Sequence, residues 1–297
     1  MKAIDILDHM MGLWHEPPRD TVDRVIYGDP QREVQAIATC WMPYRETLQR
    51  ARQIGANVIV AHEPTFFAHR DLDDPSYSQL TATREKMKLI DDLGVTIVRC
   101  HDVWDWGCPE IGTFRAWADF LELGEPITKD TRTAGKYFSV HQVPAQRAIT
   151  FARRLARKTS LFGQTLVPLY GDPDREIRSV GVGLGSAADP FSIHALGADM
   201  AIACDEDSRL RAWISGEWCH DTGYPMAVVH HAVTEEPGVA ALARYLSEAF
   251  PQVTVTHLRQ GCVHREVACR GTARPADSRS RWRTLPSCRT EPGLCRS

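Results

Sequence analysis

The chain has 297 residues, of which 43% are hydrophobic and 25% are charged, so it holds enough apolar material for a globular core of its own. No run of about 18 apolar residues occurs, so we expect no membrane span. The N-terminus lacks the apolar segment of a secretory signal, so we do not expect export. The 9 cysteines include no Cys-x-x-Cys pair and fit neither a zinc ribbon nor a disulfide framework, so we expect a reducing, cytoplasmic setting.

The net charge of −3 combines an acidic body with a basic C-terminal tail. Residues 265–297 contain 8 Arg and 3 acidic residues, and removing these from the 35 basic and 38 acidic residues leaves 27 and 35. A body this acidic argues against nucleic acid as a partner. The tail is rich in Arg, Ser, Pro and Thr without apolar periodicity, so we predict that it is disordered, with a basic interaction arm as the alternative.

Strands and helices alternate along the rest of the chain. Apolar and β-branched runs predict strands at residues 33–40, 57–61, 95–100, 135–143, 177–183, 198–204, 225–230 and 253–258. Apolar spacing and capping signals predict helices at 44–56, 78–94, 112–123, 145–159, 207–218 and 236–250. This alternation predicts an α/β fold with two parallel-rich α/β lobes. A boundary near residue 130 gives an N-terminal lobe (1–130), a C-terminal lobe (131–264) and the tail.

Imidazoles and carboxylates follow three of the predicted strands, whereas strand 33–40 ends in Cys40-Trp41-Met42. Because ligands bind beyond the carboxyl ends of the strands in sheets of this kind, we expect these side chains to share a site. They are His62 and Glu63 after the second strand, His101, Asp102 and Asp105 after the third, and His230, His231 and Glu235 after strand 225–230.

These residue types predict a carboxylate–imidazole metal site. Such donors suit Zn²⁺, Fe²⁺ or Mn²⁺, and carboxylates can bridge two ions about 3.5–4 Å apart. His231 and Glu235 are four residues apart, so one helical turn or a tight loop could place both on one ion. Thr234 is a candidate N-cap for a helix that begins at Glu235 or Glu236.

At these residues the chain resembles the NIF-three-like family, also known as the GTP cyclohydrolase type 2 homologues. The segments that resemble the family motifs are Ala61-His62-Glu63-Pro64-Thr65-Phe66-Phe67, His101-Asp102-Val103-Trp104-Asp105 and His230-His231-Ala232-Val233-Thr234-Glu235. The resemblance covers roughly residues 1–262. It implies two α/β lobes with a dinuclear metal site in the cleft between them, and a homohexameric ring.

By motif position, the resemblance implies the metal ligands His62, Asp105, His231 and Glu235. His231 is preferred to His230 because of its spacing from Glu235. Glu63 stands where the family usually has a second His. As a ligand, Glu63 would make the site richer in oxygen and shift its preference toward Mn²⁺, Fe²⁺ or Mg²⁺, or it would weaken one of the two ion sites. Alternatively, Glu63 points away and forms an ion pair.

Other residues near these motifs have more than one reading each. His101 is either an acid/base group, a partner that orients a ligand, or a packing residue. Trp104 and Trp106 flank Asp105 and either stack on a ring substrate or pack over the site. The Gly-rich stretch 181–186 is read as a tight turn, with an accessory anion site as the minority reading.

The leading functional interpretation is a metal-dependent hydrolase of the cyclohydrolase type. Two divalent ions (Fe, Zn or Mn) would lower the pKa of a bound water from 15.7 toward about 7 and hold the hydroxide against an electrophilic carbon or phosphorus of a small-molecule substrate. Asp105 and Glu235 would bind or bridge both ions, and Glu63 and His101 are the catalytic candidates. The competing interpretation is a non-catalytic metal-binding ring that acts as a regulator or scaffold, and a third is a mononuclear site.

Overall fold

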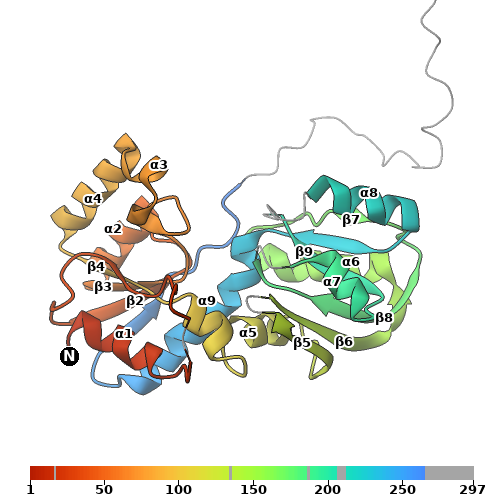
Figure 1. Cartoon of the computed structure of the whole chain (residues 1–297), viewed down its shortest axis with the longest axis horizontal. Coiled ribbons are helices and arrows are strands. Elements are labelled where there is room, and N and C mark those ends of the chain that lie inside the picture. The colour runs from red at the N-terminus through yellow and green to blue at the C-terminus, as the bar shows by residue number, and fades with distance from the viewer. Residues whose placement is uncertain (17, 134–135, 186–187, 206–211, 265–297) are drawn as a thin grey trace, which may run out of the picture. The chain divides into compact units, whose positions relative to one another are not determined.

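The computed structural model describes residues 1–264 except 17, 134–135, 186–187 and 206–211, and the described part forms one compact unit (Figure 1). The tail expected to be disordered, residues 265–297, lies outside the described residues. No helix among those described is long and apolar enough to cross a membrane.

The elements comprise helices and strands in alternation, as the sequence predicts. In chain order they are α1 (Ala3–Met11), β1 (Val25–Tyr27), β2 (Ala36–Cys40), α2 (Arg45–Gln53), β3 (Val58–Ala61), α3 (Pro75–Ser78), α4 (Thr81–Leu93), β4 (Thr96–Arg99), a π-helix (Val103–Gly107), α5 (Thr113–Phe120), β5 (Pro126–Thr133), β6 (Lys136–Arg147), α6 (Ala148–Thr159), β7 (Leu169–Tyr170), β8 (Glu176–Val182), α7 (Pro190–Ala195), β9 (Met200–Cys204), α8 (Ala212–Thr222), β10 (Met226–Val229), α9 (His231–Ala249) and β11 (Thr254–His257), with short 3₁₀ turns at Asp71–Asp73 and Ser160–Phe162. Gly94 ends α4 in the left-handed conformation that is common for a glycine after the last turn of a helix.

The first sheet has the strand order β1-β4-β3-β2-β11, and all its pairs are parallel except β1 with β4. Strand β3 is buried along its whole length, as expected for a parallel strand covered on both faces. Side chains alternate between those faces: Val58 and Val60 pack with α1 and α9, whereas Ile59 and Ala61 pack with α2 and α4.

The second sheet has the order β5-β6-β8-β9-β10-β7 and is mixed. Only β8-β9-β10 are parallel, so the parallel-rich expectation holds for the first sheet and is wrong in degree for the second. For β5 and β6 the cause is their short connection, which can only join antiparallel neighbours, and β6 with β8 and β10 with β7 are antiparallel as well. Helix α6 covers one face and α7 and α8 the other (Figure 1). The two-sheet α/β class is confirmed.

The chain returns to the first sheet at its end. Helix α9 follows β10 of the second sheet, packs on β2 and β11, and leads into β11, which pairs with β2. The last strand of the predicted C-terminal lobe (131–264) therefore lies in the sheet of the N-terminal lobe (1–130). This crossing carries the start of α9 to the strand ends of the first sheet.

Candidate metal centre

Six buried side chains form a closed ring in which imidazoles and carboxylates alternate. Each imidazole Nε2 lies within 4 Å of oxygens from two carboxylates. Every ligand and catalytic candidate named from the sequence belongs to it. In order around the ring they are His62, Asp105, His101, Glu63, His231 and Glu235.

One half of the ring is built on Asp105. His62 Nε2 lies 3.5 Å from Asp105 Oδ1, and His101 Nε2 lies 3.8 Å from Asp105 Oδ2. Asp105 sits on the π-helix, a form that is rare and frequent at functional sites. Asp23 fixes the start of this turn, because its carboxylate accepts hydrogen bonds from the backbone N–H groups of His101, Asp102 and Val103.

The other half is built on the first turn of α9. His231 Nε2 lies 2.9 Å from Glu235 Oε1 and 3.2 Å from Glu63 Oε1, and Glu235 Oε2 lies 3.5 Å from His62 Nε2. His231 and Glu235 face each other across one helical turn, as their spacing allows. Glu235 thus presents its two oxygens to two different imidazoles, as Asp105 does.

The start of α9 differs from expectation in two ways. The helix begins at His231, five residues before the predicted 236, so Thr234 lies inside it and is not the N-cap. The Thr234 hydroxyl instead donates to the His231 carbonyl. His230 is the cap, since its Nδ1 accepts from the Ala232 N–H at 3.2 Å, and this role turns it out of the ring.

Two ring atoms are buried without a hydrogen-bond partner: His62 Nε2 and Asp105 Oδ1. The other nitrogen of His62, Nδ1, lies 3.1 Å from the Cys100 carbonyl, an acceptor that fixes the proton on Nδ1 and leaves a lone pair on Nε2. A buried polar atom without a partner costs free energy, and backbone anchoring of this kind is how metal-binding histidines are oriented. The donor set and its orphaned atoms therefore fit divalent cations.

Burial makes the charge on Asp105 costly. Burial raises the pKa of Asp105 to about 6, with Glu235 adding to the effect and the His62 and His101 rings opposing it. The same burial acts on Glu235, but His231 and His62 outweigh it and hold the Glu235 pKa below its ordinary value. One of the two carboxylates that face His62 is thus destabilised in its charged form.

Replacing Asp105 with asparagine should stabilise the metal-free protein. The native carboxyl binds its proton more tightly than the unfolded one, whose pKa is about 3.9, so ionisation above pH 6 costs about 1–3 kcal/mol. Urea unfolding of metal-stripped protein at pH 7.5 should show D105N more stable by that amount. The gain should vanish as the pH falls from 6 to 4, where both side chains are neutral, and equal stability at pH 7.5 would count against the assigned cause.

Glu63 is held by a buried arginine on the neighbouring strand. Arg99, fully buried, donates to Glu63 Oε2 at 3.1 Å and to Asp71 Oδ2 at 3.4 Å. It also donates to the carbonyls of His62 and His69. Glu63 therefore forms the ion pair of the alternative reading through Oε2, but it does not point away, since Oε1 faces the ring.

His101 is oriented from the side opposite the ring. Its Nδ1 lies 2.7 Å from Asp102 Oδ1, and Asp102 Oδ2 accepts from Thr21 Oγ1 and the Val22 N–H. Burial disfavours a charged His101 imidazole, but Glu63 and the Asp102 hydrogen bond outweigh this effect and hold the His101 pKa well above its usual value. Despite its own burial, Asp102 has its pKa lowered to about 2 by His101.

Besides Asp23 and Arg99, two contributors were missed by reasoning from residue types. The indole of Trp41 donates to Glu235 Oε2 at 2.7 Å, so the strand end dismissed for lacking a ligand orients one. Gly185, in the Gly-rich stretch, lies against the ring at φ +47°, and a Cβ there would overlap His231 Nε2 and Glu235 Oε1. The backbone at Gly185 therefore lies directly against the centre.

A methyl group at Gly185 should weaken metal binding by about 10-fold or more, because it would push apart two ring side chains that must be held to fractions of an ångström. Chelator competition against G185A would measure this. Gly197→Ala is the matched control, since Gly197 has φ +86° and open space around its Cβ position. G197A shares the backbone strain without the overlap, so an equal loss in both variants would contradict a role for the space itself.

The tryptophans that flank Asp105 differ in position. Trp104 is fully buried and donates to the Gly238 carbonyl of α9, so packing is its role. Trp106 is half-buried, and its ring meets the His101 ring edge-on at 6.1 Å between centroids. Only Trp106 is placed to contact a molecule near the ring.

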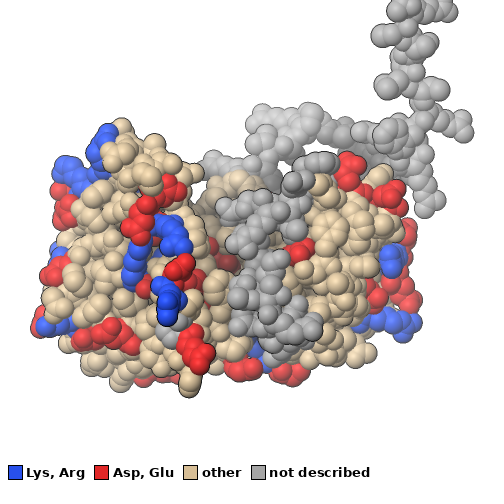
Figure 2. All heavy atoms as spheres, in the orientation of Figure 1, with Lys and Arg blue, Asp and Glu red and all other residues tan. Residues whose placement is uncertain are grey.

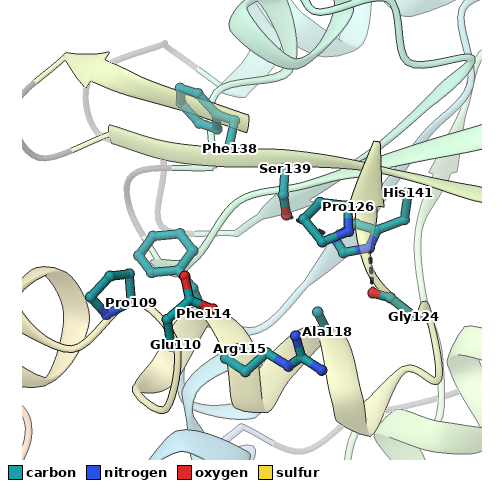
Figure 3. A pocket seen from close by; sticks show the side chains of 10 residues that line it. All are labelled: Pro109, Glu110, Phe114, Arg115, Ala118, Gly124, Pro126, Phe138, Ser139 and His141. Atoms are coloured by element: carbon teal, nitrogen blue, oxygen red, sulfur yellow. Dashed lines mark hydrogen bonds between the residues drawn. The ribbon is translucent and has the colours of Figure 1, made fainter. Parts of the chain in front are cut away.

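A hollow of about 210 Å³ lies elsewhere, between α5 and the β5–β6 hairpin (Figure 3). Ser139 and His141 point into it, and their side chains are 2.8 Å apart, while His141 Nδ1 donates to the Gly124 carbonyl. No ring residue lines this hollow. On the described part of the face in Figure 2, acidic and basic side chains are interspersed, as on an ordinary solvated surface.

Fold and ring together define a two-sheet α/β protein with a histidine–carboxylate centre. The chain belongs to the Duf34/NIF3 (NGG1p interacting factor 3) family, whose model matches residues 1–261, and the resemblance noted from the motifs is confirmed.

Individual relatives are distant in sequence. A Streptomyces coelicolor protein named GTP cyclohydrolase 1 type 2 homolog is 22% identical over 213 residues, which are 68% of this chain and 71% of the relative. Staphylococcus aureus protein SA1388 is 12% identical with a TM-score of 0.72, covering 90% of this chain and 99% of that one. A Bacillus cereus protein related to NIF3 is also 12% identical, with a TM-score of 0.69 over 91% and 99% of the two chains. At these identities the structures establish a shared fold.

Proposed function

We propose that this chain binds two divalent metal ions in the ring and acts as a metal-dependent hydrolase of the cyclohydrolase type. The observation that carries the proposal is the position of Asp105 and Glu235. Each presents its two oxygens to two different imidazoles, the arrangement needed for a carboxylate shared between two ions. A single ion would not explain why both carboxylates each face two imidazoles.

Metal identity follows from the donors. The three carboxylates and the two imidazoles of His62 and His231 form a set richer in oxygen than one with a histidine at position 63, which favours Mn²⁺ or Fe²⁺ and keeps Zn²⁺ as a candidate. Arg99 offsets part of the additional negative charge of Glu63.

When bound, a pair of such ions supplies Lewis acidity and a water acidic enough to react at neutral pH. The protein supplies position and proton transfer. Trp41 and the helical turn fix Glu235, and the Cys100 carbonyl fixes His62. His101, held on Asp102, can give or take a proton at Nε2, and Glu63 Oε1 is the second acceptor within reach.

The substrate class is a small molecule with an electrophilic carbon or phosphorus. The name of the Streptomyces coelicolor relative brings ring opening of a purine nucleotide into this class. Assembly as a homohexamer and a cytoplasmic location are parts of the same proposal, resting on the family.

Elemental analysis of purified protein followed by an activity panel tests the proposal. We expect about two ions per chain bound in the ring, and turnover of at least one member of a panel of nucleotides, phosphoesters and cyclic amides that Asp105→Ala abolishes. One ion per chain would favour a mononuclear site. Two ions without turnover across the panel would favour the alternative, a metal-binding regulator or scaffold.

A further inference from the structure

A second group of metal-capable side chains lies outside the ring: His230, Cys262 and His264. Their ligand atoms all lie within 4.8 Å of one another. Among the described residues, the groups of this kind that share one space otherwise combine only ring histidines and carboxylates, so this group alone contains sulfur.

The backbone around this group is anchored to one segment. The Cys262 N–H donates to the Phe162 carbonyl at 2.8 Å, and the His230 N–H donates to the side chain of Gln164 at 3.0 Å. Gly261, at φ +90°, allows the turn, since a Cβ there would overlap the Phe162 carbonyl. The strand end that carries His230 and the segment that carries Cys262 are therefore held side by side by local structure.

The distances match a tetrahedral site. Cys262 Sγ lies 3.5 Å from both ring nitrogens of His264, and the His230 and His264 rings are 5.2 Å apart between centroids. With Zn–S near 2.3 Å and Zn–N near 2.0–2.1 Å, two ligands of one tetrahedral Zn²⁺ are separated by about 3.5 Å. His264 is exposed, so its ring is able to turn one nitrogen toward a shared ion.

We propose that His230, Cys262 and His264 form an accessory site for a thiophilic divalent cation of the Zn²⁺ class, separate from the ring. A thiolate with two imidazoles selects such ions over Mn²⁺ or Mg²⁺, whereas the ring, rich in carboxylates, selects the harder ions. Three protein ligands leave one coordination position of a tetrahedral ion open, so the site can also transfer its ion or accept a fourth ligand.

A metal ion at this site would affect the ring through His230. The Nδ1 of His230 caps α9 by accepting from the Ala232 N–H. Metal coordination through Nε2 requires the imidazole proton to be on Nδ1, which then cannot accept. Metal binding at His230 therefore releases the cap directly before His231. Cys262 and His264 supply the stronger part of the site, and His230 couples it to the first turn of α9.

Cobalt spectroscopy on the metal-stripped full-length chain tests the proposal. Co²⁺ bound by a thiolate gives a sulfur-to-metal charge-transfer band near 300–400 nm, which the sulfur-free ring cannot produce. We expect about one equivalent of this band in the unaltered chain, from an ion additional to the two in the ring, and its loss in Cys262→Ser with total bound metal reduced from three ions to two. His62→Asn, which alters the ring, should keep the band.

Affinity and a matched cysteine complete the test. His264→Asn should weaken Zn²⁺ binding at this site at least 10-fold in chelator competition, and His230→Asn should weaken it less. Cys288→Ser, which removes a cysteine outside the described residues, should keep the full band. Zn²⁺ should also protect Cys262 from alkylation. An unaltered chain without the band, or a band that survives C262S and is lost in C288S, would overturn the proposal.

Discussion

Replacing Arg99 with methionine should lower the free energy of unfolding of the metal-free protein by about 3–5 kcal/mol, because removing one partner of a buried ion pair strands the other. Here two carboxylates are stranded. Glu63 and Asp71 are both buried and both meet the guanidinium, at 3.1 and 3.4 Å. Two backbone carbonyls, of His62 and His69, also lose a donor. Urea unfolding monitored by far-UV circular dichroism would measure the loss.

Arg45→Met is the matched control for Arg99→Met. Arg45 pairs with Glu85 at 2.6 Å, but both side chains are more than half exposed, so its replacement should cost less than about 1 kcal/mol. Arg99→Lys keeps the charge without the planar fork of donors and should recover part of the stability. If R99M and R45M were equally stable, the Arg99 cluster would not contribute as its burial implies.

The location of the centre could be predicted because its donors follow strand ends. Parallel strands deliver the residues after them to one edge of the sheet, so His62 after β3 and His101 after β4 had to lie close together. The contribution of the second sheet was less constrained, since only the crossing by α9 brings His231 to that edge. The family resemblance predicted that His231 belongs to the centre, and the structure shows its contacts with Glu63 and Glu235.

The supporting residues could not be predicted because their partners are remote in sequence. Trp41 meets Glu235, 194 residues later, and an indole has no metal-ligand signature to mark it. Arg99 did carry a signal, as a charged residue in the otherwise apolar strand β4. A buried arginine needs an acidic partner, and Glu63 lies two residues after Ala61, the residue paired with Arg99 across the sheet. The glutamate in place of histidine and the buried arginine are two parts of one feature.

The start of α9 was mispredicted because local signals were given more weight than tertiary ones. Pro237 favours a helix that begins just before it, since proline is tolerated in a first turn. The helix instead begins at His231 and includes Pro237 in its interior, which leaves one carbonyl without its helical donor. The His230 cap and the contacts of His231 and Glu235 with the ring offset that loss. The centre therefore shapes the helix that carries it.

Replacing Glu235 with glutamine should remove most metal binding. The change keeps the volume and an oxygen for the Trp41 indole, but it removes the charge that faces both His62 and His231. A ligand shared by two ions matters to both, so we expect the metal bound in the ring, measured in a Cys262→Ser background that lacks the accessory site, to fall from about two ions per chain to one or fewer. The remaining affinity should drop more than about 100-fold, the upper end of what altering groups behind the ligands costs. Elemental analysis and chelator competition would measure both.

Glu236→Gln separates this effect from burial alone. Glu236 is the next residue on α9 and is fully buried, but its carboxylate accepts from His257 Nε2 and the Gln260 N–H, away from the ring. E236Q should therefore be less stable than the unaltered chain and still bind two ions. If E235Q kept two ions at unchanged affinity, metal binding in the ring would be contradicted. Equal metal release by E236Q and E235Q would also contradict metal binding in the ring, because, of these two glutamates, only Glu235 faces His62 and His231.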